Sequence, residues 1–111
     1  MKRELENAVR QIIDLLVSGE HYDLEALTEG RRLTAAQIGS AIQEYGRTLI
    51  TPPPDQLAID AIQVTGKKPA TWSVSVPLWT REESRSDLTL ELTIEDRVDG
   101  PRVDIDNIHV L

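Results

Sequence analysis

The stretch DLTLELTIE, residues 87–95, decides the fold, because polar and apolar side chains alternate along it without interruption. A period of two predicts a β-strand with one face in a dry core and one face in water, which is typical of antiparallel sheets. The core face is expected to hold Leu88, Leu90, Leu92 and Ile94, and the solvent face Thr89, Glu91, Thr93 and Glu95.

Neighbouring segments extend the sheet on both sides of this strand. Residues 57–64 and 71–79 precede it, and residues 102–110 follow it after a turn at Asp99 and Gly100. These segments are rich in β-branched and aromatic residues and are separated by turn-forming residues. We therefore expect a four-stranded antiparallel meander.

The last of these strands contains a change of phase. Val103 and Ile105 share one face, whereas Ile108 and Val110 have the opposite parity. A bulge near residues 106–107 would turn both pairs toward the core, and we expect one there.

The first half of the chain has the three- and four-residue spacing of amphipathic helices. Apolar residues at this spacing predict helices over residues 3–18, 23–30 and 34–45. The third helix has the clearest start, because Thr34 and Gln37 form a capping box.

Helices followed by strands predict an α+β fold, with about three N-terminal helices packed on one face of the four-stranded sheet. We expect one domain over residues 1–111, because a chain of this length forms one core. It comprises a helical part over residues 1–50, a Pro-rich connector over residues 51–56 and a β-meander over residues 57–111.

The charge of the chain is acidic and unevenly distributed. The formal net charge is −7, and residues 82–106 hold nine acids and three arginines, a local balance of −6. Such a surface repels phosphate backbones and attracts basic proteins, so we expect a basic protein partner and no nucleic acid. No apolar stretch approaches the ~20 residues of a membrane span, and we recognise no secretory signal. These features predict a cytoplasmic protein that does not bind membranes.

The charged loop that follows residue 78 is a candidate interaction surface. By alternation Trp79 lies on the solvent face, and ionic side chains follow it, a composition typical of an interface anchor with a charged rim. In the alternative interpretation, Pro77 marks a bulge that turns Trp79 over the edge of the core, and Arg85 pairs with Glu82 or Glu83. The candidate interaction residues are Trp79, Arg81, Glu82, Glu83, Arg85, Asp87 and Glu91.

Few residues suggest catalysis. The serines lack a nucleophile motif, the glycines form no phosphate-binding motif, and the two histidines have no companions at metal-ligand spacing. There is also no Cys. We therefore predict no catalytic residue, no cofactor and no metal. A pocket between helices and sheet would be the alternative site, lined by Tyr45, Asp60, Trp72 and His109.

Two parts of the chain resemble known families. LWTREESRSDLTLELTI, residues 78–94, and IDNIHVL, residues 105–111, resemble a family of uncharacterised bacterial domains of unknown function. VSGEHYDLEAL, residues 17–27, and LTAAQIGSAIQEYGRTL, residues 33–49, are similar in layout to the helical part of the cystatin-like superfamily that includes nuclear transport factor 2. The second resemblance implies a cone, with helices filling the concave side of a curved antiparallel sheet. Such cones host enzymes, ligand carriers and interaction modules.

These observations predict a non-catalytic acidic protein-interaction module, and in its most specific form an immunity-type protein that neutralises a basic toxin. The alternative function is a small-molecule-binding domain or an enzyme that uses a pocket between helices and sheet. Homodimerisation through the sheet is a third option.

Overall fold

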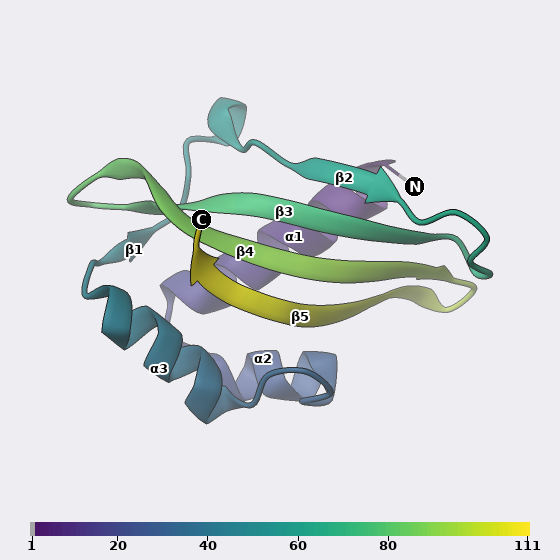
Figure 1. Ribbon diagram of the computed structural model, residues 1–111, viewed down its shortest axis with the longest axis horizontal. Coiled ribbons are helices and arrows are strands. Elements are labelled where there is room, and N and C mark those ends of the chain that lie inside the picture. The colour runs from purple at the N-terminus through teal and green to yellow at the C-terminus, as the bar shows by residue number, and fades with distance from the viewer. Residues whose placement is uncertain (1) are drawn as a thin grey trace.

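In the computed structural model, which describes residues 2–111, three helices precede one antiparallel sheet (Figure 1). The structure confirms the predicted α+β fold, although the sheet has five strands rather than four. The elements are α1 (Lys2–Val17), α2 (His21–Thr28), α3 (Ala35–Tyr45), β1 (Leu49–Ile50), the 3₁₀ turn η1 (Pro54–Gln56), β2 (Asp60–Gln63), β3 (Thr71–Thr80), β4 (Ser84–Arg97) and β5 (Gly100–Val110).

The helices form close to their predicted positions, although α2 begins at His21 and not at residue 23, so Asp23 lies inside its first turn. At the start of α3, the backbone N–H of Gln37 donates to Thr34 Oγ1 at 3.3 Å, and the backbone N–H of Thr34 donates to Gln37 Oε1 at 2.9 Å. This confirms the capping box. Gly46 caps the end of the helix, and its φ of 72° lies in the left-handed region that favours glycine.

The sheet is a meander of β3, β4 and β5, extended by two short strands along the other edge of β3. β1 pairs with residues 79–80 of β3, and β2 pairs with residues 72–75. The sequence did not predict β1, because two residues are too few to show an alternating pattern. β1 forms where the chain that leaves α3 meets the β3–β4 hairpin, since the N–H of Arg81 donates to the carbonyl of Thr48 at 2.9 Å.

One face of the sheet is covered and forms the core. α1 crosses behind β3 and β4 in Figure 1, while α2 and α3 contact β5. Leu88, Leu90, Leu92 and Ile94 of β4 are at most 2% exposed, which confirms the predicted core face. Among the described residues no helix lies over the opposite face, which we call the open face.

The expected bulge in β5 is confirmed. Glu91 pairs with Asn107 and Leu92 pairs with Ile105, so Asp106 is the extra residue. Ile108 is thereby turned into the core. The prediction for Val110 was wrong, because this last residue of β5 is 54% exposed.

The outer edge of β5 is held by two arginines from the α2–α3 connection. Arg31 Nε donates to Asp104 Oδ1 at 2.5 Å, and Arg31 Nη2 donates to the carbonyl of Val103 at 3.3 Å. Next to this pair, Arg32 Nε lies 3.6 Å from Asp106 Oδ1. An uncovered edge strand is prone to pair with other chains, so these contacts satisfy and shield the edge of β5.

Candidate interaction surface on the open sheet face

The charged β3–β4 hairpin, residues 81–83, is bound to the helical half of the molecule. Glu82 accepts two hydrogen bonds from Thr48, one from the backbone N–H at 2.9 Å and one from Oγ1 at 3.0 Å. Glu83 accepts hydrogen bonds from Tyr45 Oη at 2.8 Å and from Thr80 Oγ1 at 3.1 Å. The expected pairing of these glutamates with Arg85 is therefore wrong, because they bond to α3 and the segment after it instead.

These bonds shift the proton affinities of two groups. The backbone N–H of Thr48 holds the pKa of Glu82 below its ordinary value, because the hydrogen bond favours the carboxylate. The hydrogen bond to Glu83 raises the pKa of Tyr45, because a negative acceptor favours the protonated phenol. Glu82 and Glu83 thus fix the hairpin in place.

Trp79 lies on the open face and is half-buried. The strand pairing is irregular after Pro77, as one interpretation expected, but the extra residues lie in β4, where residues 86–88 stand opposite Leu78. β3 therefore keeps its alternation, with Leu78 in the core. Among the described residues, Trp79 is not one of the hydrophobic side chains that pack against the core. The bulge therefore does not turn Trp79 over the edge of the core, and that alternative interpretation was wrong.

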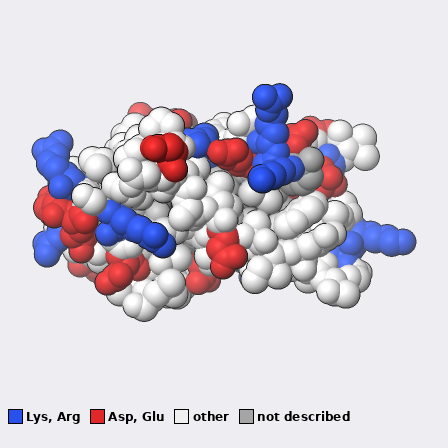
Figure 2. Space-filling model, turned by 90° about the horizontal axis from the view of Figure 1, so that it is seen from above, with Lys and Arg blue, Asp and Glu red and all other residues white. Residues whose placement is uncertain are grey.

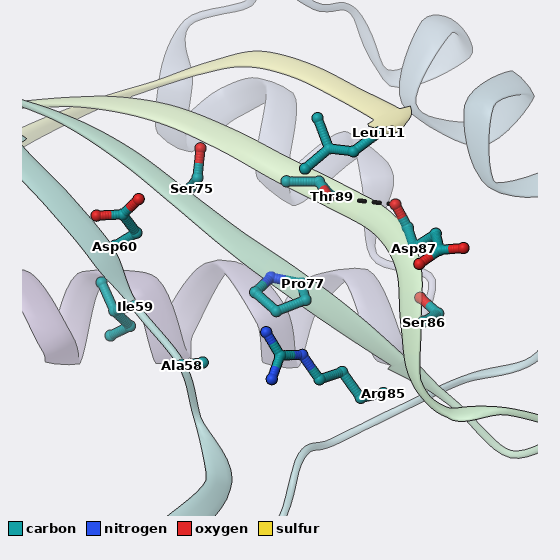
Figure 3. A pocket seen from close by; sticks show the side chains of 10 residues that line it. All are labelled: Ala58, Ile59, Asp60, Ser75, Pro77, Arg85, Ser86, Asp87, Thr89 and Leu111. Carbon is teal, nitrogen blue, oxygen red and sulfur yellow. Dashed lines mark hydrogen bonds between the residues drawn. The ribbon is translucent and has the colours of Figure 1, made fainter.

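A shallow hollow lies on the open face, and one of the residues that line it, Arg85, pairs with Trp79 across β3 and β4. It has a volume of 420 Å³ and runs between the segment before β2, strands β3 and β4, and the C-terminal residue (Figure 3). Figure 3 shows the Arg85 side chain extending below Pro77 toward the β2 segment, with Leu111 above Thr89. The lining residues are Ala58, Ile59, Asp60, Ser75, Pro77, Arg85, Ser86, Asp87, Thr89 and Leu111.

The β3–β4 irregularity shapes this hollow. Ser86 Oγ donates to the carbonyl of Leu78 at 2.7 Å and accepts from the N–H of Leu88 at 3.2 Å, which satisfies backbone groups at the bulge. The carbonyl of Asp87 accepts from Thr89 Oγ1 at 3.2 Å and from the N–H of Leu111 at 3.3 Å. These bonds place the last residue of the chain at the rim.

Three charged side chains of the hollow have no side-chain partner among residues 2–111. They are Asp60, Arg85 and Asp87, and each is exposed. Most other charges of the sheet are used internally. Glu95 pairs with Arg97 and Arg102, and the two β5 aspartates pair with the arginines after α2. The hollow therefore offers two carboxylates and one guanidinium to a binding partner.

His109 and Glu91 form a pair on the same face. His109 Nε2 lies 2.7 Å from Glu91 Oε1, and the two side chains are 37% and 36% exposed. His109 stands opposite Thr89, so it reaches Glu91 diagonally across β4 and β5. No partner for His109 could be predicted from the sequence, because this register depends on the β5 bulge.

The four residues of the alternative pocket do not come together. Tyr45 bonds to the hairpin, and Trp72 packs against the core and lines a separate groove beside α1. Asp60 and His109 lie on the open face. The space between helices and sheet is filled by aliphatic side chains such as Ile12, Ile38 and Leu90.

Other contacts that hold the hairpin, the hollow and the β5 edge in place could not be found from the sequence. Thr48, Arg31 and Leu111 carry no motif, and each acts through a partner at least 24 residues away in the chain. Within residues 2–111, no three His, Asp or Glu side chains are arranged to hold a metal ion. None of the described helices has both the length and the apolar composition needed to cross a bilayer.

The comparisons with known proteins identify a family and no activity. No curated protein and no solved structure matches the chain. One family model matches residues 13–111, which include all five strands. The chain therefore belongs to the family described as Domain of unknown function (DUF7668).

Proposed function

We propose that this protein is a non-catalytic interaction module that binds a basic protein through the open face of its sheet. The observation that carries the proposal is the hollow, in which Asp60, Arg85 and Asp87 have no side-chain partner within the described chain. Exposed charged groups that lie next to apolar surface can form ion pairs and hydrogen bonds with a partner protein.

The proposed surface differs in part from the one that the sequence suggested. Trp79, Arg85, Asp87 and Glu91 belong to it. Glu82 and Glu83 support it from behind, because their carboxylates hold the hairpin to the helical half. Arg81, exposed at the hairpin tip, is a rim residue.

The chemistry of the hollow specifies what it would bind. Ile59, Pro77 and Leu111 supply apolar contact area at the hollow, and Trp79 is a large, half-buried ring on the same face. Asp60 and Asp87 suit Lys or Arg side chains of the partner, while Arg85 suits one carboxylate. With a net charge of −7, the protein attracts a basic partner over several ångströms and orients the encounter.

The most specific form of the proposal is an immunity-type protein of a bacterial cytoplasm, which neutralises a basic toxin by covering a cationic surface. The acidic balance of the strands supports this form. We further propose that the fold is a cystatin-like cone, supported by the order of three helices before an antiparallel sheet. In this cone the interior is filled by side chains, so binding takes place outside it.

Site-specific photocross-linking tests the proposal. A photoreactive residue at Ser75, in the hollow, is compared with one at Ser40, which is exposed on α3. In an extract of the native host, the Ser75 probe should capture a protein of positive net charge that the Ser40 probe does not capture. Equal capture by both probes, or capture of acidic proteins alone, would refute binding through the open face.

A further inference from the structure

The free edge of β2 is a second exposed feature, and it is independent of the hollow as a binding site. β2 pairs only with β3, and no described element covers its other side. Figure 2 looks down on this edge of the molecule and shows white, uncharged surface over its lower right part, with basic side chains at the extreme right. Unpaired edges of this kind bind other β-strands.

The hydrogen-bond pattern shows which backbone groups are available. The N–H of Val64 donates to the carbonyl of Thr71 at 2.8 Å, so the backbone of Val64 faces β3. Backbone direction alternates along a strand. Asp60 and Ile62 therefore also bond toward β3, whereas Ala61 and Gln63 present N–H and C=O groups to the outside.

The side chains along the edge add apolar surface. Ile62 stands opposite Ser73 on the open face and is 64% exposed. On the helix side, Ala61 and Ile59 line a 550 Å³ groove with Trp72 and Leu5. The edge thus has apolar side chains on both faces of the sheet.

The charges along this segment are self-complementary. Residues 55–68 contain four charged side chains. Asp55 and Asp60 lie before β2 and at its first position, and Lys67 and Lys68 lie after its last position. An antiparallel copy of the same segment would place the acidic end of each chain beside the basic end of the other. A parallel or unrelated acidic strand would lack this match.

We propose that two copies of this protein form a homodimer by antiparallel pairing of their β2 edges, centred on Ile62. In this register Ala61 of each copy bonds to Gln63 of the other, giving roughly four backbone hydrogen bonds. The two Ile62 side chains face each other at the non-hydrogen-bonded position, where Cα atoms lie about 4.5 Å apart. The two Asp60 side chains lie about 14 Å apart along the strands, so like charges are separated.

This pairing has a consequence for the whole molecule. The two-fold axis is perpendicular to the sheet, so the two sheets join into one and both open faces lie on the same side. The dimer would present two hollows to one side. Its formation does not require that the hollow binds a partner.

Cysteine cross-linking tests the register, because the natural chain contains no Cys. Ile62→Cys should form a disulfide-linked dimer under mild oxidation, since the distance between the Cα atoms of residue 62 in the two copies suits a disulfide. Ser73→Cys is the matched control, exposed on the same face but one strand further from the axis. Cross-linking of both variants at the same rate, or of neither, would overturn the proposal.

The mass in solution provides the second measurement. Wild-type protein should sediment with twice the 12.4 kDa mass of one chain at micromolar concentrations. Ile62→Asp, which places two like charges opposite each other, should raise the dimer dissociation constant at least about tenfold. Circular dichroism should show an unchanged fold, because Ile62 is exposed. A wild-type protein that remains monomeric at all concentrations would contradict the dimer.

Discussion

The hydroxyl of Tyr45 donates a hydrogen bond to the carboxylate of Glu83, with Oη 2.8 and 2.9 Å from its two oxygens. This contact joins the last residue of α3 to the β3–β4 hairpin across 38 positions of the chain. It explains why a loop with so many charges has a defined position beside the open face.

The first prediction concerns the ionisation of Tyr45. In a Tyr22→Phe background Tyr45 is the remaining tyrosine, so the ultraviolet absorbance of its phenolate reports its pKa alone. Glu83→Gln should lower this pKa, because the negative acceptor that favours the protonated phenol is lost. Because the folded-state pKa is raised, the stability contribution is present below about pH 10 and is lost as the pH rises through that pKa. An unchanged titration in Glu83→Gln would show that the contact does not form in solution.

The second prediction concerns acid stability. The pKa of Glu82 is lowered in the folded protein, so its contribution is present above about pH 4.5 and is lost as the pH falls below that value. Melting temperatures from pH 6 to pH 3 should therefore fall less steeply in Glu82→Gln than in the wild type. Glu44→Gln, an exposed change on α3, is the control and should leave the slope unaltered. Equal slopes in all three proteins would contradict the role of the Thr48 bonds.

The third prediction concerns the edge of β5. Arg31→Met leaves Asp104 largely buried without its partner and should cost about 3 kcal/mol, the lower end of the range for buried pairs, because the Arg31 side chain is 21% exposed. Arg32→Met is the matched control. Its side chain is 60% exposed and 3.6 Å from Asp106, so its loss should cost about 0–1 kcal/mol. Denaturant unfolding measures both values, and equal costs would refute the special role of Arg31.

The fourth prediction uses the two tryptophans, which lie on opposite faces of β3. Trp72 packs against the core, so Trp72→Ala should cost about 1–3 kcal/mol. Trp79 lies on the open face, so Trp79→Ala should cost less than about 1 kcal/mol and leave the fold intact. A large fall in melting temperature for Trp79→Ala, with exposure of core surface to a hydrophobic dye, would make this ring structural instead.

Local patterns predicted the elements of this fold with good accuracy. Strict alternation in residues 87–95 defined the core face, and the Thr34–Gln37 capping box defined the start of α3. The β5 bulge followed from a change of parity that only an extra residue could correct. In each case the necessary information lies within about ten consecutive residues.

The surface could not be predicted in the same way, because its contacts join distant parts of the chain. Glu82 was expected to pair within its own loop, but its partner, Thr48, lies 34 positions earlier. Asp60 was assigned to an interior pocket, and only the β2–β3 register shows that it lies on the open face near Arg85. β1 itself was missed for the same reason, since it exists through its pairing with β3.

The affinity of the captured partner for a variant that lacks the carboxylates of the hollow tests the proposed interaction most directly. Asp60→Asn combined with Asp87→Asn keeps the shape of the hollow and removes both carboxylates. We expect calorimetric titration to show binding at least about tenfold weaker than for the wild type, with a smaller dependence on salt, and Glu44→Gln, an exposed change on α3, to bind normally. Wild-type affinity in the double variant would contradict binding of a basic partner through the open face.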